Sequence, residues 1–183
     1  MSLLAFVLIA SHVISDAGVG PVLLGAPLPK SHRNAAKLTA QYETTFYADA
    51  QPLEGFHLDE PAVFAAVDGP FTTWGQRHAP AKPPRVIKEQ AVKRALAGKL
   101  AVRMIVVRDE RLTTAAGVHV ASAWSEVKAA YPEAKIVELP GLWEEPTCLA
   151  RVGQVQFFFK RCEKGGTIGA EEKVIRIVVR EWR

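Results

Sequence analysis

The stretch that decides the fold runs from residue 147 to residue 161 and reads TCLARVGQVQFFFKR. Its β-branched and aromatic residues favour strands, and Gly153 separates two such runs as the turn of a hairpin does. The pattern predicts strands over Thr147–Arg151 and Gln154–Arg161. Because side chains alternate along a strand, we expect Phe157–Phe159 to enter a core on both sides rather than to form an exposed aromatic stripe.

Further β-structure is predicted on both sides of this hairpin. Lys135–Leu139 precedes it and Lys173–Trp182 follows it. In the final segment Ile175, Ile177 and Val179 alternate with Arg176, Val178 and Arg180, which is typical of a half-buried strand. The remaining strands are expected at Leu3–Ile9, Val22–Leu24, Tyr42–Tyr47, Ala62–Val67 and Leu100–Val107, with a short one inside Thr113–Val120.

Three segments carry helix signals. A proline before Arg85–Ala97 and a glycine after it are the expected start and stop of a helix. Ser122 is a candidate N-cap for a helix over Ser122–Tyr131, and Ser31 for a shorter one over Ser31–Thr39. Helices and strands in this order predict an α+β fold, in which antiparallel sheets are combined with two or three short helices.

The chain has 183 residues, of which 49% are apolar and 23% charged, and this is typical of one globular domain over residues 1–183. Residues 48–85 hold six of the twelve prolines, so we expect a mostly irregular excursion there. A weak internal echo relates residues 22–28 (VLLGAPL) to residues 118–124 (VHVASAW). It fits two strand–helix–sheet repeats, and chance explains it equally well because strand–turn–helix is common.

Charge is distributed unevenly within the net value of +4. Residues 41–76 contain six acidic side chains and no Lys or Arg, whereas residues 77–103 contain eight basic side chains and Glu89. The simpler interpretation is two solvated or mutually neutralising blocks, and the alternative is a polyanion-binding surface. Nucleic acid is not an expected partner, because no binding motif or interleaved aromatic residue accompanies the charges. The candidate anion-binding residues are Arg85, Lys88, Lys93, Arg94, Lys99 and Arg103.

The first ten residues, MSLLAFVLIA, are apolar and have no basic residue before them. A secretory signal requires a basic start and a cleavage site as well, so a first strand is favoured over a signal remnant. No run of 18 apolar residues occurs, and we therefore expect no transmembrane helix.

Signatures of catalysis are missing from the sequence. It contains no G-x-S-x-G, H-E-x-x-H, P-loop or dinucleotide pattern, so no catalytic residue, metal or cofactor is predicted. Only His57, near Asp59 and Glu60, lies beside carboxylates. We predict that His57 and Asp59 are not catalytic, since no third group stands at a suitable spacing. The alternative is a hydrolase with an unrecognised site in residues 48–85 that uses both.

Several stretches together resemble a known family. They are residues 13–20 (VISDAGVG), the segment from Arg103–Val107 through Thr114–Val120 into the Trp124 helix, and residues 173–183 (KVIRIVVREWR). Their order resembles the RpoE-regulated lipoproteins, which are uncharacterised Gram-negative envelope proteins. This sequence departs from that family in having no lipobox cysteine. The resemblance implies an α+β envelope domain with no assigned activity or site residues.

The two cysteines, Cys148 and Cys162, are the candidate disulfide. If Val152 pairs with Val155, Cys148 lies opposite Phe159, and an ideal hairpin keeps the two sulfurs apart on opposite faces. A one-residue bulge or a longer turn would bring them within reach. Reduced thiols and a bridge both remain open on the residues alone, and the envelope resemblance favours the bridge.

The function implied is an exported or envelope-associated, non-enzymatic binding domain. Its partner or ligand in the envelope is not identified by the sequence. The periplasm or cell envelope is the expected location, and the cytoplasm is the alternative, in which the basic block would bind a polyanion.

Overall fold

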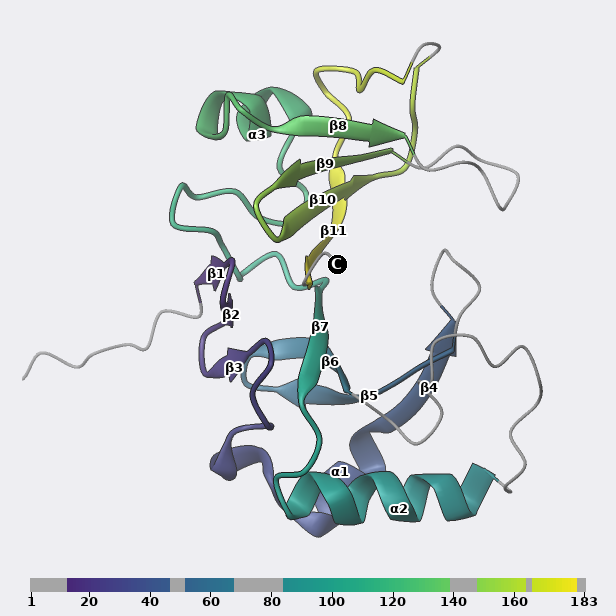
Figure 1. The fold of residues 1–183 in the computed structure, drawn as a ribbon. Helices are drawn as coiled ribbons and strands as arrows, with labels where there is room; N and C mark the ends of the chain where they lie inside the picture. Colours follow the sequence, from purple (N-terminus) through teal and green to yellow (C-terminus); the bar gives the residue numbers. More distant parts are fainter. Residues whose placement is uncertain (1–12, 47–51, 68–83, 139–147, 164–165, 181–183) are drawn as a thin grey trace, which may run out of the picture.

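The computed structural model describes residues 13–46, 52–67, 84–138, 148–163 and 166–180 (Figure 1). As predicted, the fold is α+β, with a three-stranded and an eight-stranded sheet that are both antiparallel. The described helices are η1 (Lys30–His32), α1 (Ala35–Gln41), α2 (Pro84–Leu96) and α3 (Trp124–Ala130). The small sheet contains β1 (Ile14–Ser15), β2 (Gly18–Val19) and β3 (Val22–Leu23). The large sheet contains β4 (Tyr42–Phe46), β5 (Pro52–Asp59), β6 (Ala62–Val67), β7 (Val102–Val107), β8 (Lys135–Glu138), β9 (Cys148–Val152), β10 (Val155–Phe159) and β11 (Val174–Arg180).

The large sheet is built from two halves. Its strand order is β4-β5-β6-β7-β11-β10-β9-β8, so the chain runs from one edge to the centre and then from the other edge to the centre. Figure 1 shows the first half with α1 and α2 in the lower part of the molecule and the second half with α3 in the upper part. The strands β7 and β11 join the halves along the middle of the sheet.

The pairing register makes the halves equivalent. Val106 of β7 lies directly opposite Val178 of β11, and the pairs on either side of it are Ile177 with Val107 and Val179 with Ile105. Exchanging β7 for β11 therefore reproduces the same pattern. A pseudo-two-fold axis passes between Val106 and Val178, and the strands β4–β6 correspond to β8–β10.

Each central strand carries one β-bulge. The extra residue is Arg103 in β7 and Ile175 in β11, and both lie at the strand's beginning. An extra residue reverses the alternation of side chains, so Val102 and Val174 face the main core and are 0% and 1% exposed. The final strand is therefore not half-buried as its sequence suggested. The bulge leaves Ile175 43% exposed, and Val178 on the opposite face is buried.

The sequence echo is also a structural one. Gly25 and Ala121 occupy the same place in the two repeats, and both have positive φ, 71° and 74°. Each then donates its backbone N–H to the central strand just before the bulge, Gly25 to Val102 O at 2.8 Å and Ala121 to Val174 O at 2.7 Å. The two repeats thus enter the sheet through the same backbone contact.

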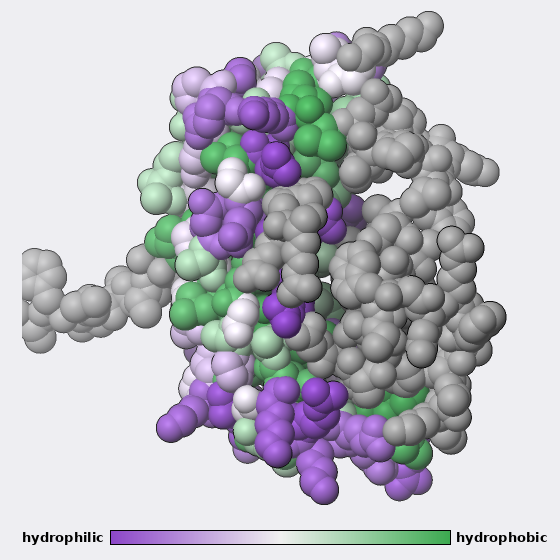
Figure 2. Space-filling model, viewed as in Figure 1, coloured by the Kyte–Doolittle hydropathy of each residue, from purple (hydrophilic) through white to green (hydrophobic). Residues whose placement is uncertain are grey.

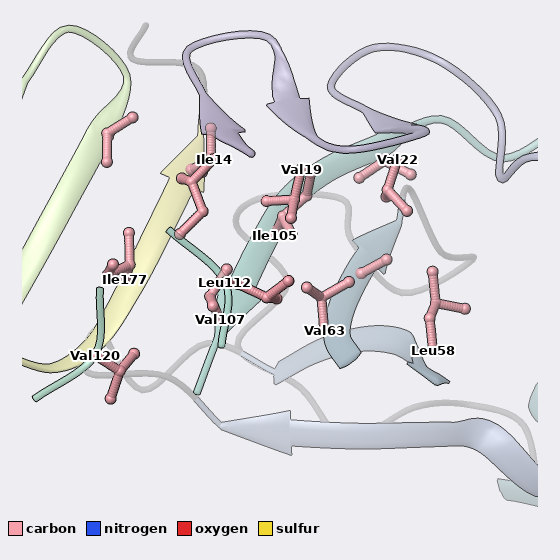
Figure 3. Packing of buried hydrophobic residues seen from close by; sticks show 14 of the residues in the cluster. Ile14, Val19, Val22, Leu58, Val63, Ile105, Val107, Leu112, Val120 and Ile177 are labelled. Carbon is pink, nitrogen blue, oxygen red and sulfur yellow. The ribbon is translucent and has the colours of Figure 1, made fainter. Parts of the chain in front are cut away.

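Apolar side chains form a core on each face of the large sheet. The larger cluster joins the inner face to the helices and to the small sheet, which contributes Ile14, Val19 and Val22 (Figure 3). The smaller cluster lies on the opposite face and contains Phe64, Val106, Phe158 and Val178, among others. Phe157 and Phe159 belong to the larger cluster and Phe158 to the smaller one, so the prediction for this run is confirmed.

The small sheet is attached at two places. Ile14 N–H donates to Thr113 O at 2.8 Å, and Gln154 N–H donates to the Asp16 carboxylate at 2.7 Å. The second contact fixes the β9–β10 turn, where Gly153 has φ 56° as a tight turn requires.

Residues 48–85, which we expected to be mostly irregular apart from a strand at Ala62–Val67, contain a second strand. Strand β5 runs from Pro52 to Asp59, ahead of the correctly predicted β6. Glu54 and Gly55 interrupt its apolar alternation, which hides it in the sequence. Gly55 is required by close packing, because a Cβ there would lie 2.5 Å from Ala65 O and 2.6 Å from the Phe64 ring.

The helix starts differ from the predicted caps. Asn34 rather than Ser31 caps α1, because its side-chain oxygen accepts from Lys37 N–H at 3.1 Å. At α3 the Glu126 carboxylate accepts from Ala123 N–H at 2.6 Å, while Ser122 accepts from another backbone group. A cap depends on which backbone N–H groups are left unpaired, and the tertiary path decides this.

Other expectations fall partly outside the described residues. The strand predicted at Leu3–Ile9 lies outside them, as does the whole of the segment 68–83. Within Thr113–Val120 the described β-structure consists of two isolated bridges, which pair Thr113 with His119 and Thr114 with Ile14. Across the described residues, no helix is long and apolar enough to cross a membrane. That residues 1–183 form one domain stays a prediction.

Candidate functional site

His57 and Asp59 lie on the exposed face of β5 rather than in a loop. His57 forms an ion pair with Glu43 of β4, and its ring centre is 5.0 Å from that of Phe64. The Asp59 carboxylate accepts from Gln41 Nε2 at 3.0 Å. Among the hydrogen bonds of the described residues, neither side chain meets a Ser, a Cys or a second His. His57 therefore has an acidic partner, Glu43, but no nucleophile beside it, and this does not favour the hydrolase alternative.

The candidate anion-binding residues separate into two groups. Arg85, Lys88, Lys93 and Arg94 lie on α2, and Lys99 follows shortly after it. Figure 2 shows a hydrophilic band along the lower edge of the molecule, where Figure 1 places α2. Arg103 is instead the bulge residue of β7 in the sheet. Arg85 is also partly neutralised, because its Nε donates to Glu89 at 3.0 Å.

A different set of cations shares one face of the second half. Arg151 lies opposite Gln156, which lies opposite Val178 of the smaller core cluster. Arg176 and Arg180 flank Val178 at two residues on either side and therefore face the same way. The charged residues that β8–β11 place on this face are all cationic, namely Lys135, Arg151, Arg176 and Arg180.

The Arg176 side chain is held in place on this face. Its guanidinium lies 4.3 Å from the centre of the Phe158 ring, which is a cation–π contact. The side chains of Arg151, Arg176 and Arg180 are all half-buried. Arg176 and Arg180 are close in the sequence, whereas Arg151 belongs to β9 and is brought to them by strand pairing. The signal available beforehand was the Arg-x-Val-x-Arg alternation of the final strand.

The residue that sequence reasoning missed altogether is Glu54. It is fully buried on β5, and neither of its carboxylate oxygens has a hydrogen-bond partner. Burial raises the pKa of Glu54 to about 7, and the attraction of the Arg94 guanidinium opposes this rise. The signal that could have found it is its spacing, since it lies two residues before Phe56 and four before Leu58, which both face the main core.

Cys148 and Cys162 form a disulfide with a Cα–Cα distance of 5.5 Å. The predicted register is confirmed, with Val152 opposite Val155 and Cys148 opposite Phe159. Neither a bulge nor a longer turn in the hairpin brings the sulfurs together. The chain instead leaves β10 after Phe159 and bends, and this returns Cys162 to Cys148.

Glu54 and Cys148 occupy corresponding positions in the two halves. Leu58 pairs with Val63 in the first hairpin, and Val152 pairs with Val155 in the second. Counting back four residues from Leu58 and from Val152 leads to Glu54 and Cys148. Both are 0% exposed. A buried carboxyl in one half therefore stands where the other half has a covalent bridge.

The described residues contain no group of three His, Cys, Asp or Glu side chains placed to hold a metal ion. No protein-family model matches the chain, and no curated protein matches it. Among solved structures the chain is similar to the uncharacterized protein yfeY from Escherichia coli, with 15% identity and a TM-score of 0.48. That alignment covers 92% of this chain and 99% of the other. Because the neighbour is itself uncharacterised, it assigns no activity.

Proposed function

We propose that this chain is an exported, non-enzymatic binding domain of the cell envelope. The disulfide between Cys148 and Cys162 carries this proposal, because such bonds persist in oxidising compartments and are rare in the cytosol. The resemblance of residues 13–20 and 173–183 to the RpoE-regulated lipoproteins supports the same location.

The cationic face of β8–β11 is the proposed binding surface. Arg151, Arg176 and Arg180 surround Gln156 and Val178, and the planar guanidinium of arginine is well suited to bind carboxylates and phosphates through two hydrogen bonds. We propose an acidic envelope component as the ligand.

Thiol labelling tests the location. The protein is expressed with and without an export signal, denatured, and treated with a thiol-alkylating label, in parallel samples with and without prior reduction. We expect no labelled thiol before reduction in the exported form and two in the form kept in the cytoplasm. Two accessible thiols in the exported form would remove the argument for export.

Titration with inorganic polyphosphate tests the surface. Arg151→Gln is expected to weaken binding about tenfold, since a charge-assisted contact contributes about 1.5 kcal/mol or more. Lys88→Gln on α2 is the matched control and is expected to have little effect. If Lys88→Gln is the variant that weakens binding, the basic helix is the site and the face of β8–β11 is not.

A further inference from the structure

Glu54 lies where the first half of the sheet meets its helices. It shares a face with Phe56, which packs in one cluster with Leu38 of α1 and with Ala91 and Ala95 of α2. On the neighbouring strand Thr44 lies directly opposite it in the pairing. Both carboxylate oxygens are buried without a hydrogen bond. An ionised carboxylate at this position has no hydrogen bond to stabilise it.

The protonation state of this carboxyl changes the energy of the contact. A buried carboxylate without hydrogen bonds is strongly disfavoured, whereas a neutral carboxylic acid is much less so. The pKa of Glu54 is raised to about 7 in consequence. The charged group on α2 that attracts the ionised Glu54 carboxylate is the exposed Arg94. Its attraction only partly offsets the unfavourable free energy of burying that charge. From α1 the cluster receives the apolar Leu38, and from β4 it receives Tyr42, whose ring packs on Phe56.

We propose that Glu54 is a proton-controlled contact that holds α1 and α2 on the sheet when it is protonated and loosens them when it ionises. Strand β5 is paired on both sides, with β4 and with β6, so the sheet side of the contact is fixed. The helix side is the part that can move to admit water. The opening is therefore local, and it leaves the central strands in place.

The second half has no such freedom at the corresponding position. There Cys148 is covalently joined to Cys162, and no proton enters or leaves in this pH range. Of the two equivalent positions, one therefore holds a covalent bond and the other holds a carboxyl group that can gain or lose a proton. Acidic surroundings tighten the first half, and neutral or alkaline surroundings loosen it.

The sign of the pH effect follows from linkage. Because the pKa in the folded state lies above that of an exposed glutamate, closure is strongest at low pH and weakens as the pH rises through about 7. Between pH 5.5 and pH 8 the equilibrium for opening should increase about tenfold to thirtyfold. Ionisation of exposed acids gives no comparable change.

Hydrogen exchange of the oxidised protein, corrected for the intrinsic rate, tests this inference. In the wild-type protein the protection of α2 should fall about tenfold to thirtyfold between pH 5.5 and pH 8, while β10 keeps its protection. The variant Glu54→Gln should abolish the fall, and Glu43→Gln, which changes an exposed acid on the neighbouring strand, should retain it.

Two results would overturn the inference. One is an equal fall in Glu54→Gln, and the other is a fall that affects β10 as much as α2. If Glu54→Gln does not fold, Arg94→Gln takes its place. Arg94 lowers the pKa of Glu54, so removing its positive charge should move the midpoint of the fall in protection to higher pH. An unchanged midpoint would contradict the role of Glu54.

Discussion

The two halves of the large sheet have the same arrangement of strands and differ in the buried group at one equivalent position. Both have four antiparallel strands in equivalent registers, with a bulge at the start of the innermost strand. The first half connects β6 to β7 through residues 68–101, which include α2, whereas the second connects β10 to β11 through residues 160–173. The backbone contacts have been kept while the buried group at the equivalent position is Glu54 in one half and Cys148 in the other.

The features that the two halves share are those that the backbone path constrains. Bulges and the positive φ at Gly25 and Ala121 are set by how the chain enters the sheet, so both copies have them. The side chain at a buried position has to fill its space but does not set the path of the chain. It can therefore diverge from a titratable carboxyl to a disulfide.

The largest expected effect is the loss of stability when the disulfide of the second half is removed. Reduction, or the double change Cys148→Ser with Cys162→Ser, should lower the free energy of unfolding by about 3 kcal/mol in the chain-entropy model for a loop of this size. Urea denaturation with and without reductant measures it. The double variant is the control, since reductant should no longer affect it. An equal midpoint for oxidised and reduced wild-type protein would show that the bridge does not stabilise this half.

A second expected effect lies in the packing of the first half. Gly55→Ala should destabilise the protein by about 1–3 kcal/mol, because the new methyl group meets the Ala65 carbonyl and the Phe64 ring. Gly169→Ala is the matched control, since its Cβ would meet only the end of the Glu163 side chain. Thermal or chemical denaturation of both variants is the measurement. A harmless Gly55→Ala would mean that β5 and β6 can move apart, contrary to the tight pairing described.

The equivalence of the two repeats is sharpened by a pair of opposite substitutions. Gly25→Ala should cost about 1 kcal/mol, because an L-residue is strained at positive φ. Ala121→Gly should have the opposite sign and gain about 0.5 kcal/mol after the added entropy of the unfolded chain is subtracted. Denaturant midpoints of both variants decide this. If both substitutions changed the stability in the same direction, Gly25 and Ala121 would not be equivalent positions.

The smallest expected effect is that of salt. Exposed pairs such as Arg85 with Glu89 contribute about 0–1 kcal/mol, so the acidic and basic blocks should matter little pair by pair. The free energy of unfolding at low and at high ionic strength should therefore be similar. A large loss at high salt would point to a coupled and partly buried network of charges instead.

The features that could be predicted from the amino-acid sequence are those that depend on local periodicity. The hairpin between β9 and β10 has the expected register because Gly153 ends one alternating run and begins another. Helix α2 follows its proline and glycine signals, and Phe157–Phe159 divide between the two faces. Each of these follows from residues that are close in the chain, where the geometry of a strand or a helix allows one outcome.

The remaining features, including most of the candidate site, depend on contacts between segments that are distant in the chain. The burial of Glu54 depends on helices that come from elsewhere in the chain, and the disulfide depends on a bend after Phe159. The bulges at Arg103 and Ile175 exist only relative to a partner strand. The physical reason is common to all of them: local sequence sets which way a side chain alternates, but the strand or helix packed against it decides whether that side is buried, charged or bridged.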